Sequence, residues 1–169
     1  DGEYPARLNK PRNLTSWFIG DRREGIDTYP DVANLRNLGM IAYYKPALGL
    51  LMLREYILGE ERFDFAFKSY IKTWAYKHPQ PADFFNHIEN ASGENLSWFF
   101  DAWFYGTGNI DLAIDSLREQ NGAYFLTVSN KGDIPMPVHM QITFEAVTKK
   151  MKKLPVELCL CGDTWTHRF

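Results

Sequence analysis

The sequence lacks the short motifs by which many catalytic and nucleotide-binding sites are recognised. It has no Gly-rich phosphate-binding loop, no Gly-x-Ser-x-Gly nucleophile turn and no His-Glu-x-x-His zinc motif. No histidine stands four residues from another, so we expect each to be a solvated or capping residue. The four are His78, His87, His139 and His167. The chain is therefore expected to contain no complete catalytic site of its own.

Cysteine is scarce as well, because only Cys159 and Cys161 are present. Residues two apart on a strand point to the same face, which is poor geometry for a mutual disulfide bond. A Cys-x-Cys pair can ligate a metal, but it needs two further ligands, and His167 is the only candidate nearby. We favour packing residues on a strand. The pair leaves the cellular compartment open.

The chain also lacks a strong net charge and a long apolar run. Its 169 residues carry a net charge of −2, which gives no electrostatic case for binding nucleic acid or an anionic membrane surface. The most apolar stretch, Ala47 to Leu53, ends at Arg54 and is far shorter than the roughly 20 residues that span a bilayer. We expect no nucleic-acid partner and no transmembrane segment.

Apolar residues are nevertheless plentiful, at 45% of the chain, which suffices for one medium or two small domains. Residues 1–30 are rich in Pro, Gly, Arg and Asn and show no sustained period. We expect an irregular segment there, with one helical turn near Leu14 to Ile19. Its polar start, Asp1 to Pro11, does not resemble a signal peptide. A structureless stretch of this length is unusual in a compact domain, so it is expected to lie against a part of the protein outside this sequence.

Residues 31–108 are predicted to be helical. Helical character begins near Asp31 and becomes strong at Pro46, which suits a first helical turn, and Gly59 is the expected C-cap. Three further helices, each with one apolar face, are expected over about 60–76, 79–93 and 96–106. Acidic residues at helix starts interact favourably with the helix dipole; they are Glu60, Glu61, Asp83 and Glu94. Short connections favour antiparallel neighbours and thus a small α-helical bundle.

Residues 109–169 change to a strand pattern. Leu112 to Arg118 and Tyr124 to Val128 are two strand-like runs, and Asn121-Gly122 between them is a strong hairpin signal. Further strands are expected over 138–144, within 147–160 and over 165–169. About five strands fit a small β-sandwich-like domain. The predicted fold class is α+β, a small α-helical bundle followed by an antiparallel β-sandwich-like domain.

One ordered set of residues stands above this background. Tyr43-Tyr44-Lys45-Pro46 precedes a leucine-rich helix that ends Leu53-Arg54-x4-Gly59. Then follow Phe63, Tyr70, Asp83-Phe84, Glu89 with Gly93, and Leu96-x2-Phe99-x3-Trp103. In order and spacing, the set resembles the zinc aminopeptidases of the aminopeptidase N type, which are gluzincin metallopeptidases. The tail from 111 to 169 is similar to the β domain that follows the catalytic domain in that family.

The resemblance assigns a role to Tyr43. It matches the tyrosine of the family's Tyr-x-Lys-Gly motif, which lies by the zinc and donates a hydrogen bond to the oxyanion formed when metal-activated water attacks the peptide carbonyl. Tyr44 takes the variable position and Lys45 the lysine, whereas Pro46 replaces the usual glycine. Without the resemblance, Tyr43 would be interpreted as an aromatic residue that packs against the helix start.

The family's other functional residues do not carry over. Its His-Glu-x-x-His motif, the downstream Glu ligand and the Gly-x-Met-Glu-Asn motif that holds the substrate amino terminus all lie upstream of the matched region. The resemblance therefore implies the C-terminal portion of a zinc metallopeptidase, an aminopeptidase, that is inactive alone. Zinc, a peptide substrate and the missing N-terminal catalytic half belong to the intact enzyme, while no cofactor or metal is expected in this chain. Helices separated from that half should expose apolar surface and self-associate.

Two alternatives stay open. The chain could be a non-catalytic binding or adaptor module, a helical unit joined to a β-sandwich that never had a catalytic partner. Within the resembled family, a related zinc site opens an epoxide instead of a peptide bond, and nothing in these residues separates the two chemistries. Substrate preference and exopeptidase or endopeptidase action are also not readable, because the residues that set them lie mostly upstream.

Overall fold

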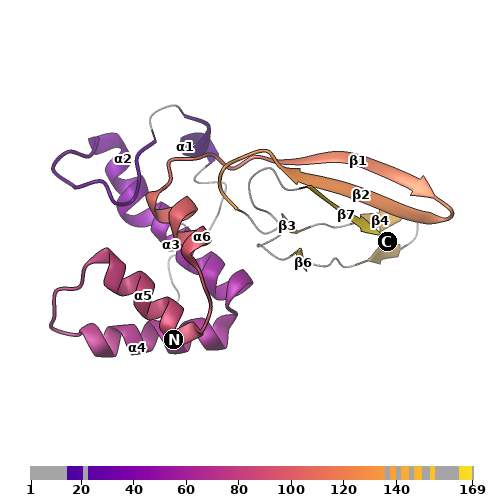
Figure 1. The fold of residues 1–169 in the computed structure, drawn as a ribbon. Helices are drawn as coiled ribbons and strands as arrows, with labels where there is room; N and C mark the ends of the chain where they lie inside the picture. Colours follow the sequence, from indigo (N-terminus) through magenta and orange to yellow (C-terminus); the bar gives the residue numbers. More distant parts are fainter. Residues whose placement is uncertain are drawn as a thin grey trace. The chain divides into compact units, whose positions relative to one another are not determined.

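The structure is a computed structural model that describes residues 15–20, 23–135, 138–139, 142–144, 147–149, 153–154 and 164–168. Contacts divide the chain into two compact units, and the division falls between Thr107 and Gly108. The first unit is helical and the second contains the strands (Figure 1). The predicted α+β class, with a helical region before the strands, is therefore confirmed. No helix in the described ranges is long and apolar enough to cross a membrane.

The first unit is built around one long helix. A short helix, α1 (Thr15–Ile19), comes first, where a helical turn was predicted. The long helix then runs without a break through α2 (Leu35–Gly39), the π-helical turn η2 (Met40–Tyr44), α3 (Lys45–Met52) and the π-helical turn η3 (Leu53–Ile57). It begins after Asn34, whose side chain accepts a hydrogen bond from the Arg36 N–H at 3.0 Å.

Pro46 lies inside this long helix, in the first turn of its segment α3. A proline has no N–H, and its ring crowds the carbonyl group four residues earlier, here that of Ala42. The preceding turn is π-helical, since the Lys45 N–H donates to the Met40 carbonyl five residues before it. The wider turn lets the chain pass the proline without ending the helix. Pro46 thus lies in the first turn of α3, as predicted, but α3 continues directly from the π-helical turn before it.

Three further helices complete the first unit. They are α4 (Glu60–Trp74), α5 (Pro81–Ser92) and α6 (Ser97–Phe100), and α6 continues into the π-helical turn η4 (Asp101–Tyr105). Helices α4 and α5 lie side by side (Figure 1). Helix α5 ends at Gly93, as predicted. Gly59 is the N-cap of α4, and the preceding turn is capped by Leu58, so the C-cap prediction is off by one residue.

Aromatic side chains form most of the core of this unit. Phe99 and Trp103 are fully buried and stack with ring centroids 5.8 Å apart, and Phe85 packs on Phe100 at 4.4 Å. Other apolar residues of this unit with less than 3% exposure are Ile41, Met52, Leu53, Ala66, Ile88 and Leu96. These apolar residues form the interior of the first unit. Not every apolar residue of α4 is buried, since 54% of Ile71 is exposed.

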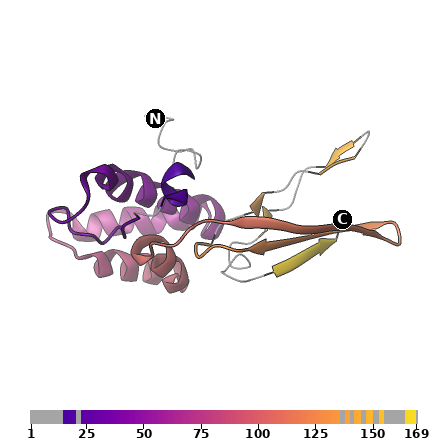
Figure 2. The same ribbon diagram turned by 90° about the horizontal axis from the view of Figure 1, so that it is seen from above.

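The second unit contains a three-stranded antiparallel sheet. Its strands are β1 (Leu112–Gln120), β2 (Ala123–Asn130) and β7 (Thr164–Arg168), in the order β1-β2-β7 (Figure 2). Asn121 and Gly122 connect β1 to β2 with φ angles of 53° and 73°. A tight hairpin of this kind needs positive φ at both turn residues, which Asn-Gly tolerates well. The hairpin prediction is confirmed.

The remaining strands of the second unit pair two by two. β3 (Val138–His139) pairs with β6 (Lys153–Leu154), and β4 (Ile142–Phe144) pairs with β5 (Val147–Lys149). The single strand predicted over 138–144 is thus divided between two ladders. The β-sandwich stays a prediction, since the described strands form one three-stranded sheet and these two pairs. Cys159 and Cys161 lie outside the described residues, and so does the side chain of His167.

Candidate functional site

Tyr43 stands near the end of the π-helical turn η2, with its side chain toward solvent. Its exposed fraction is 67%. Within the described part of the chain, no residue forms a hydrogen bond with its hydroxyl group. The interpretation of Tyr43 as an aromatic packed against a helix start therefore does not fit. The phenol hydroxyl is a hydrogen-bond donor that projects from a helix and is accessible from solvent.

Lys45, two residues later, points in the opposite sense and is fully buried. Its Nζ atom donates a hydrogen bond to the Gly106 carbonyl at 2.6 Å and lies 5.7 Å from the centroid of the Trp17 ring. Successive residues two apart on a helix project from nearly opposite sides. One face of η2 and α3 is thus anchored by a lysine while the other presents the tyrosine.

Burial controls the protonation of Lys45. The pKa of Lys45 is lowered from 10.5 to about 8, mainly because burial removes water from around the ammonium, and the charge of Arg23 acts in the same direction. The negative charge of Asp27 opposes this effect and raises the pKa of Lys45. The amine is therefore still largely charged at neutral pH, inside a core formed mostly by apolar groups.

Lys45→Met should remove a pH dependence of stability. Between pH about 8 and about 10.5 the unfolded chain keeps the Lys45 proton and the fold has lost it, so the free energy of unfolding rises with pH. The shift corresponds to about 3 kcal/mol. Urea unfolding on both sides of this pH window should show the rise in the parent chain and not in the variant. An equal rise in both proteins would contradict the burial of this charge.

The carbonyl that accepts from Lys45 is itself held tightly. The Gly106 N–H donates to the Asp101 carbonyl at 2.8 Å, which closes the π-helical turn η4. A Cβ atom on Gly106 would lie 2.6 Å from the Ala102 carbonyl oxygen, closer than packed atoms approach. Position 106 therefore has no room for a side chain, although its backbone angles are ordinary.

Gly106→Ala should destabilise the first unit by about 1–3 kcal/mol, the usual cost of adding a methyl group where there is no space. The clash is with backbone, which cannot rotate away as a flexible side chain can. Thermal unfolding followed by helical circular dichroism measures the loss. Gly39→Ala is a matched control, because a Cβ atom there meets nothing within 4 Å. Equal losses in the two variants would show that crowding at Gly106 is not the cause.

Residues from the start of the unit complete the surroundings of Lys45. The Trp17 Nε1–H donates to the Asn37 side-chain oxygen at 3.1 Å, which fixes the ring that the lysine faces. Arg23 donates from Nε to the Thr107 carbonyl at 2.7 Å and from Nη1 to the Phe18 carbonyl. The segment that the sequence predicted to be irregular thus supplies part of the packing around the long helix.

Comparison with known proteins shows which family this segment is similar to. Residues 24–103 match the peptidase family M1 domain. The match contains Tyr43 and Lys45, together with every helix from α2 to α6. Residues 24–103 are thus similar to the peptidase family M1 domain. Aminopeptidase N of Lactococcus lactis subsp. lactis is 29% identical over 111 residues, which are 62% of this chain and 12% of that protein.

A solved structure shares the fold. It is the crystal structure of Legionella pneumophila aminopeptidase A in complex with aspartic acid, with a TM-score of 0.57 and 21% identity. The likeness covers 76% of this chain and 15% of that one. The chain thus spans about one eighth of the curated relative that it matches and a similar share of the solved chain.

The other residues of the M1 resemblance have structural partners. Glu89 accepts hydrogen bonds at Oε1 from the Leu96 N–H at 2.7 Å and from the Ser97 hydroxyl at 3.2 Å. Its carboxylate thus satisfies the open N–H groups where α6 begins, as the side chain of Asn95 does for Ser97. Asp83 accepts from the Gln80 N–H at 2.8 Å in a capping box.

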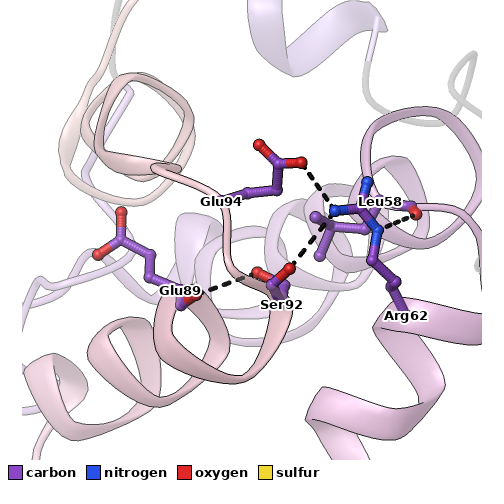
Figure 3. A network of polar contacts seen from close by, with 5 residues as sticks. All are labelled: Leu58, Arg62, Glu89, Ser92 and Glu94. Atoms are coloured by element: carbon purple, nitrogen blue, oxygen red, sulfur yellow. Dashed lines mark hydrogen bonds and ion pairs between the residues drawn. The ribbon is translucent and has the colours of Figure 1, made fainter.

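Glu94 does not have the predicted role of an acidic residue that interacts with the dipole at a helix start. It lies in the turn after α5 and forms an ion pair with Arg62 at 2.7 Å (Figure 3). The same guanidinium reaches the Ser92 and Leu58 carbonyls at 3.4 Å, so it joins the start of α4 to the end of α5. A sequence pattern places Glu94 near a helix end but cannot show that its partner is 32 residues away.

Two more polar pairs in this M1 segment hold helices together. The Arg54 guanidinium binds the Asp64 carboxylate with two hydrogen bonds, of 2.8 and 3.2 Å, and lowers the pKa of that carboxyl group. His87 shares a hydrogen bond of 2.7 Å with the Ser69 hydroxyl and was not found as a paired residue from sequence. Ser69 also donates to the Ala66 carbonyl, so this contact is a bridge between α4 and α5.

The ligands that a zinc ion would need are not found among the residues that the structure describes. No three His, Cys, Asp or Glu side chains there come together in a way that could hold a metal ion. The donor set of this part of the chain therefore does not fit a zinc site, and the ligands of one would have to come from elsewhere. Tyr43, whose role the sequence assigned only by resemblance, has no metal-ligating partner within the described ranges.

Proposed function

We propose that this chain is the C-terminal portion of a zinc-dependent metallopeptidase, an aminopeptidase that hydrolyses peptide bonds in the intact protein. Residues 31–108 would be the end of the catalytic domain and 109–169 the β domain that follows it. The observation that carries this proposal is the M1 match over 24–103 together with an exposed Tyr43 inside it. The small share of the relatives that this chain spans supports a longer parent protein.

Tyr43 supplies one chemical group to that reaction. Attack on a peptide carbonyl places negative charge on its oxygen, and a phenol O–H held in position can donate a hydrogen bond to that charge. A helix holds such a donor more accurately than a loop does. Since the described residues do not form a zinc site, the chain alone is expected to be inactive and to gain activity only with the missing catalytic half.

The proposal is tested on the longer protein. The sequence upstream of Asp1 should contain His-Glu-x-x-His with a Glu about 20 residues further on, where the two histidines share one helix face. The longer protein should hydrolyse aminoacyl substrates with a zinc content near one per chain, whereas this chain alone should not. A longer protein without the motif or the activity would favour the binding or adaptor module. Hydrolysis of an epoxide in place of the peptide would favour the related chemistry.

Self-association is expected of this chain on its own. Large apolar side chains of the segment 19–35 are exposed to solvent; they are Ile19, Tyr29, Val32 and Leu35. Exposed apolar surface of this kind favours association between copies. Sedimentation velocity over a range of concentrations should show dimers or larger species, and Leu35→Ser should weaken them. A monomer at the highest concentration would contradict this expectation.

A further inference from the structure

The cost of burying Lys45 is the starting observation. Lys45 is fully buried; its Nζ atom donates to one carbonyl oxygen at 2.6 Å and lies 5.7 Å from the centroid of an indole ring, and the charge of Asp27 offsets only part of the cost of burial. Burying a charged amine is unfavourable unless it is well paired, and the lowered pKa of Lys45 reports this cost. A methionine of similar length would fill the same space without it. Stability alone therefore does not account for a lysine here.

The position of Lys45 along the helix gives the second observation. Ile41, Leu48 and Met52 are buried on the same face of η2 and α3, so Lys45 stands in the middle of an apolar stripe. Its partner Gly106 is 61 residues further along the chain and closes η4. The hydrogen bond therefore ties the wide turn η2 to a second wide turn. This contact links the end of the turn that bears Tyr43 to a distant part of the chain, and it therefore restrains that turn.

We propose that Lys45 is a positioning residue for Tyr43: by binding the Gly106 carbonyl it fixes the turn from which the phenol projects. This inference rests on the proposed function of Tyr43. Lys45 does not touch the substrate in this scheme, because it lies inside the protein on the other side of the helix. Lys45 instead sets the orientation of the Tyr43 phenol O–H. A small misorientation of such a group lowers turnover on the order of 10- to 100-fold.

A double-mutant cycle in the longer, active protein tests the proposal. We expect Lys45→Met to lower kcat by about 10-fold or more with little change in KM, because an interaction made only in the transition state is weakened. Adding Lys45→Met to Tyr43→Phe should then cause no further loss, since the group being positioned is gone. If Lys45→Met does not fold, Lys45→Gln, an uncharged donor, replaces it in the same cycle.

The control separates positioning from loss of stability. Met52→Ala removes a buried side chain from the same helix without touching the ammonium, and it should lower the unfolding temperature while leaving kcat unchanged. An unchanged kcat in the Lys45 variant would overturn the inference. It would also be overturned if the fold-loss of kcat in the double variant equalled the product of the fold-losses in the two single variants. Full turnover in Tyr43→Phe alone would instead reject the proposed function of Tyr43.

Discussion

Tyr43→Phe in the longer, active protein should lower turnover by about 100- to 1,000-fold, the usual cost of removing one hydrogen bond to a developing oxyanion. The substitution deletes only the hydroxyl, which projects from a side chain that is 67% exposed and makes no hydrogen bond within the described residues. Stability should therefore change little. Steady-state kinetics with an aminoacyl substrate measure the loss, and metal analysis should show an unchanged zinc content.

Tyr44→Phe is the matched control for this prediction. Tyr44 is the next residue of the same turn and is half-buried. Its substitution also removes a phenol hydroxyl, but one that projects from the helix in a different direction. We expect its turnover to stay within about threefold of the parent protein. Equal losses at the two positions would point to a disturbed helix, and unchanged turnover in Tyr43→Phe would reject the role given to that residue.

Features governed by neighbouring residues were predictable from sequence. The hairpin follows from Asn121-Gly122, whose residues accept positive φ, and the end of α5 follows from Gly93 in the left-handed region. The aromatic residues Phe99 and Trp103 were placed in the core by their helical spacing. In each case the signal lies within a few residues, so no knowledge of distant partners was needed.

Features governed by distant partners were not predictable in the same way. Pro46 indicated the first turn of α3, but the proline alone could not show that α3 continues from a π-helical turn. Lys45 was noted only as part of a motif, because its acceptor is 61 residues away. One signal could have found its burial. The spacing of Ile41, Lys45, Leu48 and Met52 puts the lysine in the centre of an apolar face, where a solvated lysine is not expected.

The role of Tyr43 could be inferred only by resemblance. The spacing and periodicity of the sequence do not distinguish an exposed tyrosine that donates a hydrogen bond to a transition state from an exposed tyrosine without a catalytic role. The M1 match over 24–103 supports the inference, because it contains the whole of η2 and α3. The sequence has no His-Glu-x-x-His motif, and the described residues form no group that could hold a metal ion. The rest of such a site would therefore come from residues outside this chain.

Trp103→Ala should destabilise the first unit by about 3–5 kcal/mol, since it removes the largest fully buried side chain and leaves a cavity. The indole stacks on Phe99 at 5.8 Å and meets the Phe18 ring edge-on at 6.3 Å. It also lies against α3, where a Cβ atom on Gly49 would be 3.6 Å from the ring. Three segments of the unit therefore lose contacts at once.

Urea unfolding of this chain, followed by helical circular dichroism, measures the loss from Trp103→Ala. Trp74→Ala is the matched control, because Trp74 lies half-buried at the end of α4, where its ring faces the Lys77 ammonium at 5.8 Å. Its removal should cost about 1 kcal/mol or less. The same large loss in both variants, or a small loss in both, would contradict a core centred on Trp103. A loss confined to Trp103→Ala would support a core centred on that side chain, because it lies between α1, α3 and α6.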